Sequence, residues 1–410
     1  MTTPDNKDKK VLNVPALRFP EFTEEWKEER LSKIAELSKG VGISKEQLSE
    51  DGEPCILYGE LYTKYKSEII HKVISKTNIE SSNLKRSKRN DVIIPCSGET
   101  AIDIAVARCV PFDNILLGGD LNIIRLHKDD GAFMAYQLNG KRKIDIAQLA
   151  QGVSVVHLYG ENIKAIKTYN PCLQEQQKIV KLLSMLDERI EVQNKIIEKY
   201  ESLIQAMCDT LIGKKTQQVM LSFNDFGESY SGLSGKSAED FGEGSPYITY
   251  MNVYQNQIID ITDIGLVKIN KTEQQSLVQY GDILFTLSSE TPEEVGMGAV
   301  YLGETYPLYL NSFCFGIHIT DESKIFPPFL AYYVSSESFR KAVFPLAQGS
   351  TRFNLQKGDF MKKVFPFPTI EQQRKIYSIL KTYSDRLNIE KQMIKLLCSQ
   401  KQYLLRQLFI

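Results

Sequence analysis

One stretch of this 410-residue chain occurs twice, and the two copies align without a gap. The first copy covers residues 170–213 and begins NPCLQEQQKIVKLLSMLDERI, whereas the second covers 367–410 and begins FPTIEQQRKIYSILKTYSDRL. Pro171 falls on Pro368, a shift of 197 positions, and the same shift places LAQG at 149–152 on LAQG at 346–349. A register this long indicates internal duplication, so we expect two equivalent units.

Each copy is predicted to form a long helix with an apolar heptad seam. Apolar residues recur every seven positions in the first copy, and the second copy repeats the pattern less strictly. The seam residues are Leu183, Leu186, Ile190, Ile197, Ile204 and Leu211, and then Leu380, Leu387, Ile394, Leu397, Leu404 and Leu408. Heptads of this length are typical of coiled coils. We expect the two helices to pack on each other; the alternative is that each packs only on its own domain.

The helix ends carry start signals, and a polar pair interrupts the seam. Pro171 is expected at the first helical position of the first copy, and Thr369 with Gln372 has capping-box spacing in the second. Gln193 and Glu390 fall on one equivalent seam position, where a polar residue commonly fixes the register of a coiled coil.

The sequence predicts an α+β fold with alternating globular domains and long helices. We expect a disordered tail at 1–12, domains at 13–169 and 214–366, and helices at 170–213 and 367–410. Short β-like runs alternate with turn signals in both domains, which are therefore expected to be mixed α/β. The duplication predicts two such domains, each followed by a long helix, and two similar units joined by antiparallel helices would have pseudo-twofold symmetry.

Weaker matches connect the starts of the two domains. LRFPEF at 17–22 resembles LSFNDF at 221–226, and ELSKG at 36–40 resembles ESYSG at 228–232. The shifts are 204 and 192, which differ by 12 residues. The second domain is therefore expected to lack a segment after Phe226, including counterparts of Trp26 and Leu31.

Composition and motifs argue against catalysis by this chain. The sequence contains neither GxGxxG nor GxxxxGK[ST], no methyltransferase tetrapeptide of the [DNS]PP[FYW] type, and no metal spacing among its 4 histidines. The 7 cysteines form no CxxC pair, which indicates a reducing cytoplasm, and no apolar run is long enough for a membrane span. The formal net charge of −1 gives no hint of nucleic acid, so such a hint must come from local patches.

Candidate DNA-binding residues are basic clusters and polar groups beside predicted strands or turns. Basic side chains suit phosphates, whereas hydroxyls, amides and arginine read base edges. In the first domain the candidates are Lys85, Arg86, Lys88, Arg89, Ser97, Thr100, Lys141, Arg142 and Ser154. In the second they are Tyr250 and Asn252 on a predicted strand, Ser288, Thr291, Thr351, Arg352 and Asn354. The alternative for each is a solvated loop, a turn or a helix cap; for Arg352 it is the cap of the preceding helix.

The chain resembles the DNA-specificity subunit of type I restriction–modification enzymes. The resemblance is carried by LRFPEF with Trp26, by NPCLQEQQKIVKLLSMLDERI, and by GSTRFNLQKGDF leading into FPFPTIEQQRKI. It implies two target recognition domains that each read half of a split DNA sequence, separated by an antiparallel coiled coil of the two long helices that sets their spacing.

The resemblance also implies partners and cofactors outside this chain. The subunit would be non-catalytic and would bind two methyltransferase subunits that use S-adenosylmethionine. Through them it would bind ATP-driven restriction subunits, so ATP and Mg are also expected on partners. Two other readings remain open: a coiled-coil adaptor that binds only proteins, and an enzyme with an unrecognised site.

Overall fold

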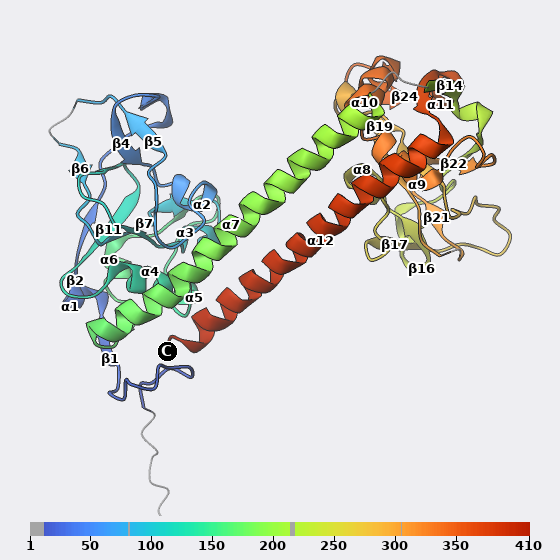
Figure 1. The fold of residues 1–410 in the computed structure, drawn as a ribbon. Coiled ribbons are helices and arrows are strands. Elements are labelled where there is room, and N and C mark those ends of the chain that lie inside the picture. Colours follow the sequence, from blue (N-terminus) through green and yellow to red (C-terminus); the bar gives the residue numbers. More distant parts are fainter. Residues whose placement is uncertain (1–11, 81–82, 214–217, 305) are drawn as a thin grey trace, which may run out of the picture. The chain divides into compact units, whose positions relative to one another are not determined.

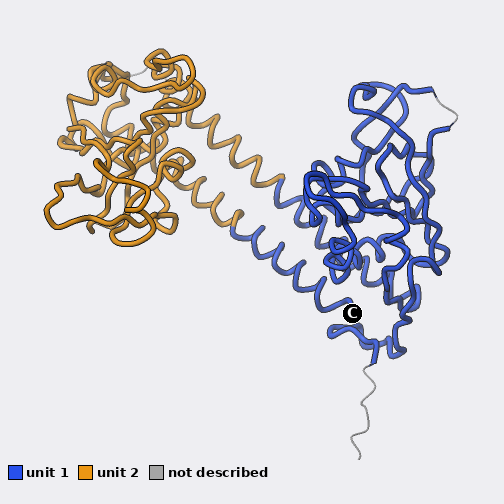
Figure 2. The backbone as a smooth tube through the Cα atoms, turned by 180° about the vertical axis from the view of Figure 1, so that it is seen from behind, with its two compact units in different colours: residues 1–194, 392–410 blue, residues 195–391 orange. Residues whose placement is uncertain are grey.

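The computed structural model describes residues 12–80, 83–213, 218–304 and 306–410, which fall into two compact units (Figure 1, Figure 2). Unit 1 contains the chain up to Asn194 together with Gln392–Ile410, and unit 2 contains Lys195–Lys391. The boundaries fall inside the two long helices α7 (Leu173–Ile212) and α12 (Ile370–Gln407). Each long helix therefore begins in one unit and ends in the other, and the expected α+β architecture is confirmed.

The two long helices pack against each other within each unit. In unit 1, Ile179 and Leu183 of α7 share an apolar cluster with Leu408 near the chain end. In unit 2, Cys208 and Ile212 from the end of α7 pack with the first turns of α12. The start of one helix meets the end of the other in both units, so the helices are antiparallel there.

All twelve residues of the predicted seam are buried or half-buried. Six of its residues are buried, namely Leu183, Leu186, Ile204, Leu380, Leu397 and Leu408. The other six are half-buried, namely Ile190, Ile197, Leu211, Leu387, Ile394 and Leu404. Gln193 and Glu390 are buried as well, and Glu390 pairs with Arg386 at 2.6 Å. Pro171 precedes the first residue of α7 and so is not at the first helical position.

Unit 1 carries the first α/β domain. Its elements are β1 (Lys27–Arg30), α1 (Leu31–Ile34), β2 (Ala35–Lys39), η1 (Lys45–Gln47), β3 (Leu48–Ser49), β4 (Glu53–Ile56), α2 (Glu60–Thr63), β5 (Ser75–Thr77), β6 (Lys85–Arg86), β7 (Asp91–Pro95), β8 (Ser97–Gly98), α3 (Ala101–Ile104), β9 (Arg108–Val110), β10 (Leu116–Leu117), β11 (Leu121–Leu126), α4 (Gly131–Asn139), α5 (Lys143–Gln148), β12 (Val156–His157), α6 (Gly160–Ile163) and β13 (Lys167–Asn170). Its central antiparallel sheet has the order β2-β11-β7-β9.

Unit 2 carries the second α/β domain. Its elements are β14 (Gln218–Ser222), η2 (Phe223–Asp225), β15 (Gly227–Ser231), η3 (Ala238–Asp240), β16 (Phe241–Ile248), α8 (Tyr250–Gln255), β17 (Ile264–Val267), β18 (Ile283–Thr286), β19 (Ser288–Ser289), η4 (Pro292–Glu294), β20 (Gly298–Val300), β21 (Tyr309–Leu310), β22 (Cys314–Ile319), α9 (Pro327–Tyr333), α10 (Glu337–Val343), η5 (Phe344–Leu346), β23 (Ala347–Gln348), β24 (Phe353–Leu355), α11 (Lys357–Lys362) and β25 (Val364–Pro368). Its central sheet, β15-β22-β18-β20, repeats the order of the first domain.

The strand register corrects the match between the starts of the two domains. β1 pairs with β13 and β14 pairs with β25, with Lys27 opposite Asn170 and Val219 opposite Phe367. Asn170 and Phe367 are equivalent in the long repeat, so the shift here is 219 − 27 = 192. At that shift Leu31 corresponds to Phe223, and both side chains are fully buried.

The expected gap after Phe226 is therefore wrong. The LRFPEF motif lies in a segment that precedes the repeated domain, and Leu17 N–H donates to the Gln407 carbonyl at 2.9 Å. Trp26 in the same segment packs edge-on against Phe133 and Phe409. The similar motifs LRFPEF and LSFNDF therefore occupy different positions in the two units. Phe223 and Phe226 of the second motif lie in the core of a domain, whereas the first motif lies before its domain.

None of the helices in the described ranges is both long and apolar enough to cross a membrane. All seven cysteines are free, and five of them are buried.

Candidate nucleic-acid interface

Both domains build the same small hairpin from the repeated LAQG stretch. In unit 2, β24 pairs with β23 and with β19, so Asn354 lies opposite both Gln348 and Ser288. In unit 1, His157 lies opposite both Gln151 and Ser97. The two domains thus place equivalent residues at the same three positions of one supersecondary unit.

The turn of each hairpin requires a glycine. Gly152 has φ +119° and Gly349 has φ +138°, in the region that favours glycine. A Cβ on Gly152 would lie 2.2 Å from the Val155 carbonyl oxygen, and one on Gly349 would lie 2.0 Å from that of Arg352. The last residue of LAQG is therefore fixed by backbone geometry in both copies.

The residues that follow this glycine form two exposed tips of different chemistry. In unit 1 the tip is Val153, Ser154 and Val155, and Val153 is 98% exposed. In unit 2 the tip is Ser350, Thr351 and Arg352, all three exposed. Asn354, on the adjoining strand β24, is exposed too.

The Arg352 side chain extends from a hairpin rather than from a helix end. The preceding helix α10 ends at Val343, and two further elements, η5 and β23, separate it from the turn. Within the described ranges, no hydrogen bond or ion pair engages the Arg352 guanidinium. The helix-cap alternative is therefore wrong, and this cation is free for a ligand.

Asn252 cannot contact DNA. Tyr250 and Asn252 lie on the short helix α8, not on the predicted strand, because the Thr249 side chain accepts from Asn252 N–H at 3.1 Å and starts a helix. Asn252 is fully buried and donates to the Asp260 carbonyl at 2.8 Å and to the Asp263 carbonyl. The half-buried Tyr250 hydroxyl donates to the Ser288 carbonyl at 2.7 Å.

The hydroxyl candidates before the short helices have mainly structural roles. Ser97 is buried, and its hydroxyl donates to Asp120 at 3.1 Å, so it is unavailable to DNA. Thr100 caps α3 by accepting from Asp103 N–H at 3.2 Å. Ser288 is half-buried, and Thr291 is exposed at the start of η4.

The predicted basic cluster at 85–89 divides into paired and free cations. Arg86, on the edge strand β6, makes a bidentate ion pair with Glu53 at 2.6 and 3.0 Å, and this hydrogen bonding raises the pKa of Arg86. Lys85 is half-buried. Lys88 and Arg89 are exposed, and no other described residue bonds their charged groups. These last two side chains are the ones suited to phosphate contacts.

The second basic cluster is largely engaged by the chain itself. Arg142 donates to the carbonyl of Ile410 at 2.7 Å, pairs with Asp145 at 3.0 Å and lies over the Tyr169 ring at 5.5 Å. Arg142 therefore holds Ile410 in unit 1, and its guanidinium is already engaged within the chain. Lys141 remains exposed.

An aromatic and basic group beside the first hairpin was not predicted from the sequence. A hollow there is lined by residues that include Lys39, Tyr159 and Lys164. Tyr159 is 48% exposed, stacks on His157 and lies 5.9 Å from Lys39 Nζ. Exposed aromatic rings next to cations are typical of nucleic-acid surfaces. The alternation of His157 and Tyr159 along β12 and beyond was the signal that could have revealed it.

The described parts of the chain hold no cluster of three or more His, Cys, Asp or Glu side chains arranged for a metal ion. Apart from Val153 and Val155, the exposed groups identified above are donors, cations and rings, which suit binding of a polyanion.

Comparisons with known proteins agree across the chain. The family model described as "Type I restriction modification DNA specificity domain" matches twice, at residues 23–202 and 220–397. A curated relative is the type I restriction enzyme MjaVIII specificity subunit of Methanocaldococcus jannaschii, 24% identical over 412 residues, which cover 94% of this chain and 91% of that one.

Two solved structures share the fold. One is the S subunit of a type I restriction–modification system from M. genitalium, with a TM-score of 0.58, 18% identity, and coverage of 97% of this chain and 99% of that one. The other comes from a study of complex assembly and conformational transition of the type I R-M system. Its TM-score is 0.58 at 15% identity, with 94% of this chain and 97% of that one covered.

Proposed function

Since this chain belongs to the type I restriction–modification DNA specificity family and carries two copies of the family's domain, we propose that it reads a split DNA target. Each domain reads one half of the target, and the long helices set the gap between the halves. The chain is a specificity subunit and does not itself methylate or cleave DNA.

One observation supports two-part reading above all others. The two domains present the same hairpin, with a glycine of positive φ at its turn. Its tip is Val153–Ser154–Val155 in the first domain and Ser350–Thr351–Arg352 in the second. An identical scaffold with different exposed side chains suits two surfaces of one kind that read different sequences. Arginine bonds guanine in the major groove, whereas valine and serine suit a thymine methyl and a neighbouring acceptor.

Phosphate contacts would position each domain on the duplex. Lys88 and Arg89 supply free charge in the first domain, and Lys39 with Tyr159 lies beside its hairpin. Such contacts raise the affinity for all sequences and make it salt-dependent, whereas base contacts supply the discrimination.

The duplication also supports the number of partner subunits in the proposed complex. Equivalent surfaces bind equivalent partners, so the two repeated units would dock two methyltransferase subunits. Those subunits would carry S-adenosylmethionine, and restriction subunits joined through them would use ATP and Mg, all in the cytoplasm. The measured mass of the reconstituted complex should correspond to two methyltransferase subunits per chain, and saturation at one would contradict this stoichiometry.

Selection of DNA from a random-sequence pool by the reconstituted complex tests the reading function. We expect recovery of two short, different sequence elements at one fixed separation, with binding that weakens as salt rises. A protein-only adaptor would recover no sequence. The chain without partners should transfer no labelled methyl group to DNA, and transfer by it would identify an enzyme instead.

A further inference from the structure

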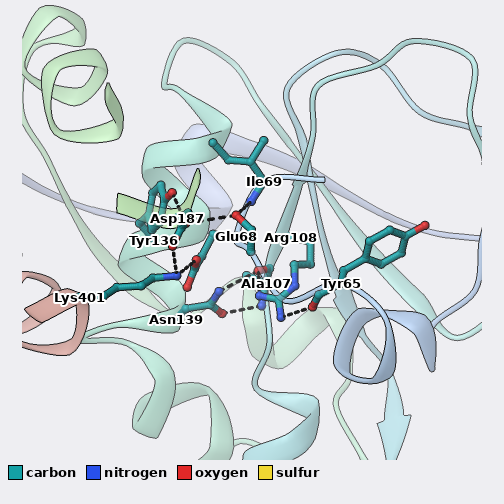
Figure 3. Close-up of polar contacts among 10 residues, drawn as sticks. Tyr65, Glu68, Ile69, Ala107, Arg108, Tyr136, Asn139, Asp187 and Lys401 are labelled. Atoms are coloured by element: carbon teal, nitrogen blue, oxygen red, sulfur yellow. Dashed lines mark hydrogen bonds and ion pairs between the residues drawn. The ribbon is translucent and has the colours of Figure 1, made fainter. Parts of the chain in front are cut away.

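A buried set of four charged side chains joins the end of α12 to the first domain (Figure 3). Lys401 of α12 pairs with Asp187 of α7 at 2.6 Å and with Glu68, which follows α2. Arg108 on β9 is buried, interacts electrostatically with both carboxylates, and donates to the Tyr65 carbonyl at 2.8 Å. We call Glu68, Arg108, Asp187 and Lys401 the charge quartet; its two cations balance its two acids.

Neighbouring groups hold the charge quartet in place. The Tyr136 hydroxyl donates to Asp187 at 2.7 Å, and the Ser67 hydroxyl donates to the same oxygen at 3.1 Å. Burial acts to lower the pKa of Lys401, but Glu68 and Asp187 outweigh it, so the pKa is raised. Lys401 is therefore charged at neutral pH although its side chain is only 15% exposed.

The equivalent site in unit 2 keeps the tyrosine but not the acid. The Tyr332 hydroxyl donates to the Ser384 hydroxyl at 3.0 Å, as that of Tyr136 does to Asp187. The positions agree with the long repeat, because 187 + 197 = 384. A neutral hydroxyl therefore stands where unit 1 has a carboxylate.

The lysine of the charge quartet is also absent from the second site. Lys401 maps to 401 − 197 = 204 on the end of α7, where Ile204 is buried in unit 2. The end of α12, which lies in unit 1, thus carries a cation at this position. The end of α7, which lies in unit 2, carries an aliphatic side chain there.

Matching β-bridges identify the last two positions. Cys109 N–H donates to the Glu68 carbonyl at 2.8 Å, and Val300 N–H donates to the Gln257 carbonyl at 3.0 Å, beside the parallel bridges Ile69–Cys109 and Ile258–Val300. Glu68 therefore corresponds to Gln257. Arg108, next to Cys109, corresponds to Ala299, next to Val300. All four charges of unit 1 are replaced by neutral residues in unit 2.

We propose that the charge quartet is a pairing code that makes the first domain accept the end of α12 and reject the end of α7. The partner that it excludes is a second copy of the same half-chain. Two first halves together would place Ile204 against Glu68, Asp187 and Arg108 and leave a net buried negative charge. Two second halves together would bury Lys401 among Gln257, Ala299 and Ser384 with no carboxylate.

The physical basis is the asymmetry between making and breaking a buried ion pair. A complete buried pair contributes little net stability, whereas the loss of one partner leaves an uncompensated charge and is strongly destabilising. The code therefore works by penalising wrong pairs, on the order of 100-fold for each wrong pairing. Without it, the repeated seams would let like halves associate.

The test uses full-length protein cleaved only after folding, through a protease site inserted between Gly213 and Gln218. The cleaved protein is incubated under mildly destabilising conditions so that halves can exchange, and native mass spectrometry then counts the pairs. We expect the unaltered protein to show one first half with one second half almost exclusively.

Two single substitutions should relax the code in opposite directions. Lys401→Ile removes the buried cation from the second half, so pairs of two second halves should appear. Ile204→Lys supplies a cation to the acids of the first domain, so pairs of two first halves should appear. Lys395→Ile, at an exposed position of the same helix, is the matched control and should leave the pairing unchanged.

Abundant like pairs in the unaltered protein would overturn the proposal, as would both variants keeping only unlike pairs. The measurement involves no DNA, so its failure would leave the proposed reading function untouched.

Discussion

Gln176 and Gln373 make the same two hydrogen bonds in the two units of the chain. Each Nε2 donates to a proline carbonyl five residues earlier, that of Pro171 at 3.0 Å and that of Pro368 at 2.9 Å. Each Oε1 accepts a backbone N–H at 2.8 Å from the residue before a domain helix, Asp130 before α4 and Phe326 before α9. The repeated glutamine thus fixes the start of each long helix to its own domain.

Loss of this amide should destabilise the unit that contains it. Gln176→Ala would leave the buried Pro171 carbonyl and Asp130 N–H without this partner, at a cost of about 1–3 kcal/mol. Denaturant unfolding measures the change in the free energy of unfolding. Gln174→Ala, at an exposed position of the same helix, is the control. Equal free energies of unfolding for the two variants would show that the Gln176 hydrogen bonds do not stabilise the unit.

The sequence could predict features with long, regular signals. The heptads predict both long helices, and the LAQG repeat indicates the duplication, but no sequence pattern predicted the hairpin that LAQG forms. The prediction that Asn252 lies on a strand was wrong. The alternation of residues around Asn252 is typical of a strand, whereas the N-cap that starts α8 is a single hydrogen bond to the Thr249 side chain. The charge quartet was invisible because Glu68 and Lys401 are brought together only by the fold.

Arg352 should discriminate bases in the second half of the target only. Its guanidinium is exposed and free of partners among the described residues, so Arg352→Ala should cost about 1–3 kcal/mol at one base position. Affinities against single-base variants of both half-targets measure this. Arg352→Lys keeps the charge but loses bidentate bonding, so it should not restore discrimination. A uniform loss across all variants would assign Arg352 to phosphate.

Lys88 and Arg89 should contribute affinity without discrimination. Replacing both with Gln should weaken binding to every sequence alike and lower the salt slope by roughly 0.9 for each phosphate that is no longer neutralised. The control is Arg86→Gln, which should change the slope less because Arg86 is already paired with Glu53. A change in sequence preference in the double variant would contradict the phosphate assignment.

Thiol reactivity should separate two cysteines from the other five. The buried thiols are Cys55, Cys96, Cys109, Cys208 and Cys314. Burial raises the pKa of Cys109 and Cys208 to about 12, so they carry almost no thiolate at pH 8. We expect two fast reactions with a thiol reagent, at the exposed Cys172 and Cys398, and five more after unfolding. Cys172→Ser should remove one fast reaction; more than two in the unaltered protein would contradict the described packing.

The long helices should act as a ruler. One heptad inserted between Glu191 and Lys195, and another between Asn388 and Gln392, keeps the seam and lengthens each helix by about 10 Å. Both half-target sequences should survive while the gap between them widens. A heptad inserted in α7 alone is the control and should disrupt the pairing of the seams. An active double variant with an unchanged gap would show that the helices do not set the spacing.

The most direct test of two-part reading is a map of methylated adenines in cells that carry this chain with the proposed methyltransferase subunit. The two hairpin tips differ in every residue, Val153–Ser154–Val155 against Ser350–Thr351–Arg352. We therefore predict methylation at a target with two unlike half-sequences and one fixed gap. Methylation at a continuous target, or at one with two identical halves, would contradict the reading of separate half-targets by the two domains.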